Sequence, residues 1–137
     1  MVDKKKLETN PRKITRKEVL MGRDVANPLT PEMETNLETL LIAVNLIRDL
    51  YGKPMTVSSG YRPAAANAAA GGAKRSAHLT CEAVDFADPD RKLMQWLLRN
   101  LDILEKAGLY LESPIGTPHW CHLQTRPPKS GKRVFIP

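Results

Sequence analysis

The chain has 137 residues, of which 42% are hydrophobic, and this composition suits one compact domain with a modest core. Its two cysteines are too few for a disulfide scaffold, no apolar run is long enough to span a membrane, and the residues after Met1 do not resemble a secretory signal. We therefore expect a protein that is cytoplasmic as synthesised, with no signal peptide and no integral membrane association.

The formal charge of +6 comes largely from the two ends of the chain. Basic ends attract nucleic acid, an anionic membrane surface or an anionic polymer, and they are often simply solvated termini. A nucleic-acid-binding protein would gather its Lys and Arg side chains on one face. Because the charges sit at the ends instead, we expect no nucleic-acid partner. The basic residues at the ends are Lys4, Lys5, Lys6, Arg12, Lys13, Arg16, Lys17, Arg126, Lys129, Lys132 and Arg133.

Residues 1–28 are charged and irregular, with Pro11, Gly22 and Pro28 as breaks. We interpret them as a charged N-terminal arm, in which ITRKEVL can form a short helix, and we expect residues 29–137 to form the single folded domain.

A helix near residues 31–51 is the strongest structural prediction. Thr30 precedes Pro31, which is tolerated at the first helical position, and acidic residues in the first turn favour a helix start. Gly52 is suited to end the helix. The apolar residues between them recur at helical spacing and are Leu37, Leu40, Leu41, Val44 and Ile47.

The middle of the chain alternates strands with helical segments. MTVSS at 55–59 reads as a short strand followed by a GYRP turn, and the alanine-rich stretch that ends at Gly71 and Gly72 is ambiguous between helix and loop. CEAVDFA at 81–87 alternates as a strand does, which places Ala83, Asp85 and Ala87 on one face.

The second half predicts one helical region and two strands. Asp88 caps a helix that Pro89 opens, and helical character continues toward Gly108. LYLE at 109–112 and WCHLQ at 120–124 read as strands, and the second places Trp120, His122 and Gln124 on one face.

A catalytic zinc site needs three nitrogen or carboxylate donors and one position left for water. Three residues of this chain are of suitable types. His78 ends the glycine-rich stretch, Asp85 lies seven residues later on a predicted strand, and His122 lies on another strand. A His and an Asp at this spacing are common in any chain, so the pair alone is weak evidence.

Three segments together resemble the D-alanyl-D-alanine metallopeptidases of peptidase family M15, in particular short phage-type wall peptidases. They are SSGYRP at 58–63, GGAKRSAHLTCEAVDF at 71–86 and WCHLQ at 120–124. The resemblance implies an α+β fold, a small antiparallel sheet with flanking helices, as in the hedgehog signalling domain and the DD-peptidases. It also implies one zinc ion per chain, held by His78, Asp85 and His122.

The implied activity is zinc-dependent hydrolysis of amide bonds in peptidoglycan stem peptides or cross-links, as a DD-carboxypeptidase or an endopeptidase, with a phage endolysin as one candidate role. Peptidoglycan would be the partner, reached after release or export by another route, and a monomer is favoured. The alternative is a non-catalytic, zinc-stabilised wall-binding or virion-structural module of the same fold.

Further residues receive roles on the same basis. Arg62 is the candidate for stabilising an oxyanion or binding a substrate carboxylate. Glu112 and His119 are alternative general bases, of which we favour Glu112. Ser76 and Gln124 are expected to orient ligands or substrate.

Two aromatic residues and two cysteines complete the set of candidates. Trp120 would line the cleft, whereas Trp96 is expected in the core. Cys81 stands where the family usually has Gly, which matters if the backbone there needs a positive φ. Cys81 and Cys121 flank proposed ligands, so a sulfur ligand or a bridge is conceivable, but two buried apolar side chains are favoured.

Overall fold

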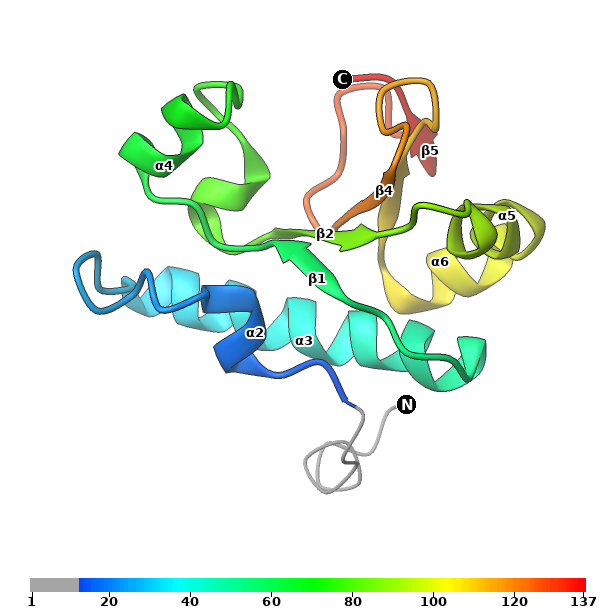
Figure 1. Ribbon diagram of the computed structural model, residues 1–137, viewed down its shortest axis with the longest axis horizontal. Helices are drawn as coiled ribbons and strands as arrows, with labels where there is room; N and C mark the ends of the chain where they lie inside the picture. The colour runs from blue at the N-terminus through cyan, green and yellow to red at the C-terminus, as the bar shows by residue number, and fades with distance from the viewer. Residues whose placement is uncertain (1–12) are drawn as a thin grey trace.

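The computed structural model describes residues 13–137, which form an α+β fold around a five-stranded sheet (Figure 1). Within this range, no helix combines the length and the apolar character needed to cross a bilayer. In chain order the elements are α2 (Arg16–Leu20), α3 (Pro31–Tyr51), β1 (Val57–Ser59), α4 (Ala64–Ala69), the 3₁₀ helix η1 (Ala77–Thr80), β2 (Ala83–Ala87), α5 (Lys92–Arg99), α6 (Leu101–Ala107), β3 (Tyr110–Glu112), β4 (Trp120–Gln124) and β5 (Val134–Phe135).

The strands lie in the order β1-β2-β4-β3-β5. The first three neighbouring pairs are antiparallel, and β5 lies parallel to β3 at the edge. The small antiparallel sheet expected from the sequence is therefore confirmed, with one parallel pair added where the chain returns past β3. At the centre of the sheet, Asp85 on β2 is directly opposite His122 on β4.

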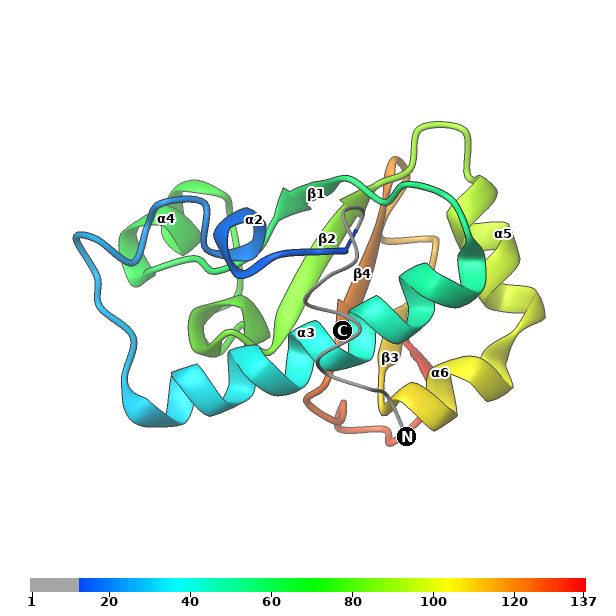
Figure 2. The same ribbon diagram turned by 90° about the horizontal axis from the view of Figure 1, so that it is seen from below.

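Helix α3 has the bounds that the sequence predicts, because strong local signals set both of its ends. The Thr30 side chain accepts a hydrogen bond from the backbone N–H of Met33, and Pro31 occupies the first turn. Gly52 ends the helix in a left-handed conformation with φ of 73°. The helix crosses one face of the sheet, as Figure 2 shows from below.

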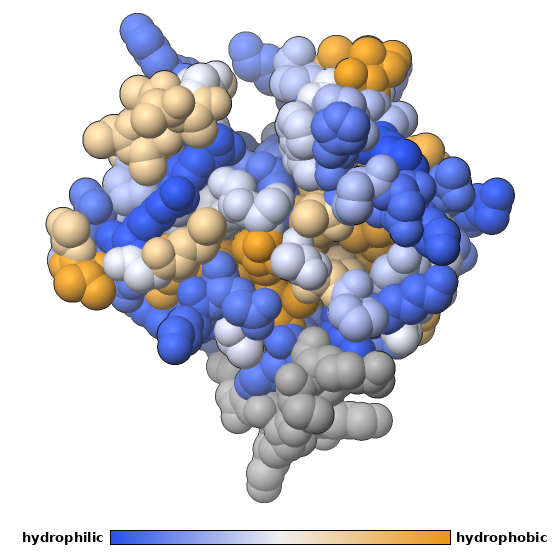
Figure 3. Space-filling view, in the orientation of Figure 1, coloured by the Kyte–Doolittle hydropathy of each residue, from blue (hydrophilic) through white to orange (hydrophobic). Residues whose placement is uncertain are grey.

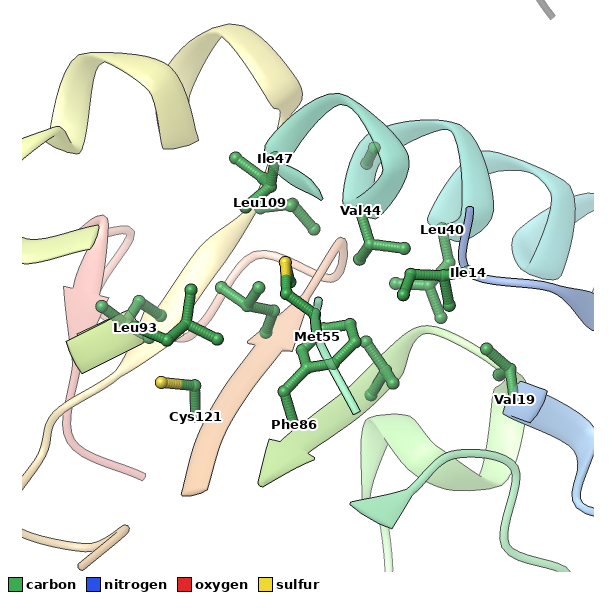
Figure 4. Packing of buried hydrophobic residues seen from close by; sticks show 14 of the residues in the cluster. Ile14, Val19, Leu40, Val44, Ile47, Met55, Phe86, Leu93, Leu109 and Cys121 are labelled. Atoms are coloured by element: carbon green, nitrogen blue, oxygen red, sulfur yellow. The ribbon is translucent and has the colours of Figure 1, made fainter. Parts of the chain in front are cut away.

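The core fills the space between α3 and the sheet (Figure 4). Side chains alternate along a strand, and the residues on either side of Asp85 in β2 and of His122 in β4 point into the core. Asp85 and His122 therefore point to the opposite face of the sheet. Burial of each large apolar side chain contributes about 1.5–3 kcal/mol, so this face is strongly fixed. The buried side chains of α3, β2 and β4 include Leu37, Leu40, Val44, Ile47, Val84, Phe86, Cys121 and Leu123.

The helical region after β2 differs from the prediction, because it begins later and is divided. Arg91 has φ of 63°, a left-handed conformation that delays the start of α5, and Asn100 separates α5 from α6. The N-cap residue of α5 is Arg91 and not Asp88, but the Asp88 carboxylate accepts the first-turn backbone N–H groups of Leu93 and Met94 at 3.0 and 2.9 Å.

Residues 13–28, assigned to the charged arm, pack against the rest of the fold. Their apolar side chains Ile14, Val19 and Leu20 are buried, and the short predicted helix is α2. The buried Asn45 of α3 binds both the backbone N–H and the carbonyl of Ile14, at 2.7 and 2.9 Å. The apolar residues of the segment thus join the core, Arg16 and Lys17 are exposed, and the half-buried Arg23 donates to the Tyr61 carbonyl at 2.9 Å. Residues 1–12 of the expected arm lie outside the described residues.

Candidate metal centre

Three buried side chains converge on the face of the sheet that lies opposite α3. His78 comes from η1, Asp85 from β2 and His122 from β4, and one ligand atom from each lies within 4.8 Å of the others. The surface is hollowed between the lobe that carries α4 and the lobe of the β3–β4 loop and the C-terminal segment (Figures 1 and 3). Strands β2 and β4 run beneath this hollow, so the cluster lies at the base of a cleft.

His78 is held so that one ring nitrogen is left for a ligand. The Ser76 hydroxyl accepts the backbone N–H of His78 at 3.2 Å, which starts the 3₁₀ turn. Nδ1 of His78 lies 2.8 Å from the Gly60 carbonyl, which can only accept, so Nδ1 carries a proton and Nε2 is the ring nitrogen that faces the cluster. Nε2 is buried 3.3 Å from Asp85 Oδ2, without a hydrogen-bond partner in residues 13–137. A cation beside Nε2 would satisfy both atoms.

Asp85 is ionised between the two imidazoles. Its Oδ1 lies 2.8 Å from Nδ1 of His122, across the β2–β4 ladder. Burial by itself raises the pKa of Asp85, but its contacts and charge interactions with His122 and His78 outweigh burial and hold that pKa well below its usual range. The cluster therefore supplies a carboxylate at any ordinary pH.

His122 has an acceptor at each ring nitrogen. Nε2 lies 2.7 Å from Oε1 of Gln124, whose amide nitrogen donates to the Arg126 carbonyl at 2.7 Å, so the orientation of the amide is fixed. Burial lowers the pKa of His122, yet the contacts with Asp85 and Gln124 raise it overall. Nδ1 therefore holds either a proton or a metal ion against Asp85, the pattern of metal-binding histidines whose other nitrogen donates to an outer group.

Arg62 lies beside the cluster and is half-buried. Its backbone N–H donates to the carbonyl of His78 at 3.1 Å, and its Nε is buried without a hydrogen-bond partner among the described residues. Burial lowers the pKa of Arg62, and the charge of Asp85 raises it, which places the guanidinium within electrostatic reach of the cluster.

The structure separates the two candidates for a general base. Glu112, at the end of β3, is half-buried, and burial raises the pKa of its carboxyl while the charges of all three cluster residues act on it. The side chain of His119 is exposed, and its carbonyl accepts the backbone N–H of Asp88 at 2.8 Å. Glu112 is thus the candidate that the fold brings to the cluster.

The remaining predicted site residues have separate places. The Ser76 hydroxyl contacts the backbone of His78, and Oε1 of Gln124 contacts the ring of His122. Trp120 is half-buried at the start of β4, on the strand face of His122. Trp96 packs against the core and against Tyr51, with ring centroids 5.1 Å apart, as expected of a core residue.

The cysteines belong to the core and not to the cluster. Both are free, buried and part of the hydrophobic cluster under α3. Burial raises the pKa of Cys81 to about 12, so it is a neutral thiol. Burial and the neighbouring Asp88 also raise the pKa of Cys121. Cys81 does adopt a positive φ, of 61°, where the family pattern has Gly.

The contacts of Arg126 with the segment around His78 were not predicted from the sequence. Arg126, assigned to the basic end, forms a 2.9 Å ion pair with Glu82 and donates to Thr80 Oγ1 at 2.8 Å. It also donates to the Arg75 carbonyl at 2.6 Å. These contacts join the segment that carries His78 to the end of β4, and no local signal links residues 44 positions apart.

The role of Gly60 beside His78 was not predicted either, because the sequence assigned Gly60 only to the turn after the first strand. Its carbonyl fixes the ring of His78, and a Cβ at this position would lie 2.1 Å from the carbonyl oxygen of Val19. The glycine after the strand was the available signal, since glycine marks close backbone approaches.

A buried His-Asp-His cluster beneath a cleft, with a carboxylate and a guanidinium beside it, is the arrangement expected of a hydrolase that uses a metal ion. The chain belongs to the Peptidase M15 family, because the sequence model of that family, described as Peptidase M15, matches residues 9–115. His122 lies beyond the matched residues, so its place in the cluster rests on the structure. No curated protein matches the chain significantly.

Proposed function

We propose that this family member is a zinc-dependent peptidase that hydrolyses amide bonds in peptidoglycan stem peptides or cross-links. The observation that carries the proposal is the buried Nε2 of His78, which has no hydrogen-bond partner in the described part of the chain and faces Asp85. Together with Nδ1 of His122, these atoms form the two-nitrogen, one-carboxylate donor set that suits catalytic zinc.

When bound, the zinc ion would supply Lewis-acid polarisation of a peptide carbonyl and activation of water. Glu112 would accept the proton of the attacking water and return it to the leaving amine, and burial raises the pKa of its carboxyl, which makes it a stronger base than an exposed glutamate. Arg62 would donate from its permanently charged guanidinium to the developing oxyanion or to a substrate carboxylate. Gly60 and Gln124 would keep the two rings in place.

Basic side chains on both sides of the cluster support an anionic wall polymer as substrate. Lys74 and Arg75 are exposed on the segment before η1, and Lys129 and Lys132 are exposed on the segment after β4. Cationic groups near a cleft raise the local concentration of an anionic substrate. The half-buried Glu112, whose carboxyl interacts with the charges of all three cluster residues, favours an enzyme over the alternative of a non-catalytic zinc module.

The test combines metal content with hydrolysis of purified peptidoglycan, followed by mass spectrometry of the released products. We expect one zinc per chain in the wild type, loss of zinc in His78→Ala, and retained zinc with turnover lowered about 10²–10⁴-fold in Glu112→Gln. His119→Ala is the matched control and should remain active. Release of free D-alanine would identify a carboxypeptidase, and shortened cross-linked peptides an endopeptidase. Bound zinc without hydrolysis would support the non-catalytic module, and absence of zinc would overturn the proposal.

A further inference from the structure

The carboxylate of Glu112 packs directly against the backbone of Gly116. A Cβ built on Gly116 would lie 2.5 Å from Oε2 of Glu112 and 3.7 Å from its Cδ. Real Cβ atoms essentially never come within 3.0 Å of another heavy atom, so any side chain at position 116 requires one of the two partners to move. The absence of a side chain at Gly116 therefore creates the space that the carboxylate occupies.

The backbone of this loop is the partner that is held in place. The N–H of Ser113 donates to the Phe135 carbonyl at 2.7 Å, and the N–H of Gly116 donates to the Ser113 carbonyl at 3.1 Å. Thr117 is fully buried, and its carbonyl accepts a hydrogen bond from the Arg91 guanidinium. Attachment on both sides of Gly116 leaves the loop little freedom to retreat.

The carboxylate of Glu112 is the partner that can move. Over residues 13–137 no hydrogen bond holds it, and the backbone of Gly116 is in direct contact with it. The end of a glutamate side chain changes rotamer at low cost compared with a hydrogen-bonded backbone. A methyl group at position 116 would therefore displace the carboxylate and leave the fold intact.

We propose that Gly116 is a positioning residue, which lets the Glu112 carboxylate rest at the place from which it serves the His78–Asp85–His122 cluster. The inference rests on the proposed function, in which Glu112 is the general base. Gly116 does not touch substrate in this role; it acts only through the position of the glutamate.

The test is Gly116→Ala, because Gly116 does not have the positive φ that would strain an alanine. We expect kcat to fall at least about 10-fold with KM, zinc content and melting temperature nearly unchanged, since a misplaced base lowers transition-state stabilisation and not ground-state binding. The acid limb of the kcat pH profile should move, because the carboxyl leaves its half-buried position. Ile115→Ala, a change of the exposed neighbour in the same loop, is the control and should keep the wild-type kcat.

A double-mutant cycle separates this role from a structural one. In the Glu112→Gln background, Gly116→Ala should cause no further loss of turnover, because the group it displaces no longer acts as a base. An equal loss in both backgrounds, or wild-type kcat in Gly116→Ala, would overturn the inference.

A second measurement does not need activity. The carboxyl carbon of Glu112 in zinc-free protein should titrate at a different pH in Gly116→Ala than in the wild type, as followed by NMR, and identical titrations would contradict the inference. If the wild type hydrolyses nothing but the two titrations differ, the proposed function is contradicted. The effect of Gly116 on the position of the Glu112 carboxylate is then still supported.

Discussion

Oε1 of Gln124 lies 2.7 Å from Nε2 of His122, on the side of the ring opposite to its contact with Asp85. An imidazole with an acceptor at both nitrogens is stable as an imidazolium, or as a neutral ring with a cation in place of one proton. A metal ion bound at Nδ1 of His122 would take the place of a proton, and this exchange would make the stability of the protein depend on pH and metal together.

The metal-free protein should lose stability as the pH rises through neutrality. The pKa of His122 is raised in the folded state above its ordinary value of 6.5. The stabilisation that the protonated ring contributes is therefore complete below pH 6.5 and is lost as the pH rises through the pKa of the folded state. The pKa of Asp85 is lowered, so its contribution is already present above its ordinary value of 3.8 and declines only in acid.

Thermal unfolding in the presence of a chelator, between pH 6 and pH 9, measures this effect. We expect the melting temperature to decrease with pH, to decrease less in His122→Ala, and to be restored by zinc most strongly at the alkaline end, where the ion does not compete with the proton. A melting temperature of the metal-free protein that rises across this range would argue against an imidazolium between Asp85 and Gln124.

Removal of the outer acceptor should weaken metal binding without removing a ligand. Gln124→Leu leaves the Nε2 proton of His122 without an acceptor and frees the ring to rotate, so we expect zinc affinity to fall about 10–100-fold. Competition with a chromophoric chelator measures the change. Gln124→Glu keeps an acceptor at the same place and should retain most of the affinity, and equal loss in both variants would contradict the orienting role.

Local patterns determined which parts of the fold the sequence could predict. The predicted helix near residues 31–51 matches α3 because Thr30 and Gly52 act on the backbone next to them. Two-residue alternation placed Asp85 and His122 on the correct face of their strands. The start of α5 was missed, because the left-handed turn at Arg91 has no marker such as glycine.

Long-range contacts determined what the sequence could not predict. The charges within residues 1–28 suggested a charged N-terminal arm, and they gave no sign that Val19 accepts a backbone hydrogen bond from Tyr61 at 2.8 Å and has a fully buried side chain. Residue spacing could not place Glu112 or His119 relative to the cluster, whereas in the packed sheet the charges of all three cluster residues act on the Glu112 carboxyl. Such contacts depend on tertiary packing, which residue spacing does not encode.

The close crossing of Gly60 and Val19 predicts a severe effect of a single methyl group. In Gly60→Ala the new Cβ would lie 2.1 Å from the backbone oxygen of Val19, so the N-terminal segment or the turn after β1 must shift. We expect a loss of about 3 kcal/mol or more in the free energy of unfolding, measured by urea denaturation. Gly116→Ala is the matched control, because its clash is with a movable side chain, and it should cost under about 1 kcal/mol. Similar stabilities of the two variants would show that residues 13–28 are not firmly docked.

The left-handed backbone at Cys81, with φ of 61° and ψ of 30°, predicts an inverted order of stability for two small substitutions. Cys81→Ala and Cys81→Gly both remove the buried thiol, but only glycine adopts this conformation without the cost of about 1 kcal/mol that a Cβ imposes. In regular structure alanine is the more stable of the two by about 0.5–1 kcal/mol. Here we expect the free energy of unfolding of Cys81→Gly, measured by urea denaturation, to exceed that of Cys81→Ala by about 1 kcal/mol. Zinc content should be equal in both variants, because the thiol lies in the core. If the alanine variant were the more stable, the turn that joins His78 to β2 would not be strained, and the usual family glycine at this position would need another explanation.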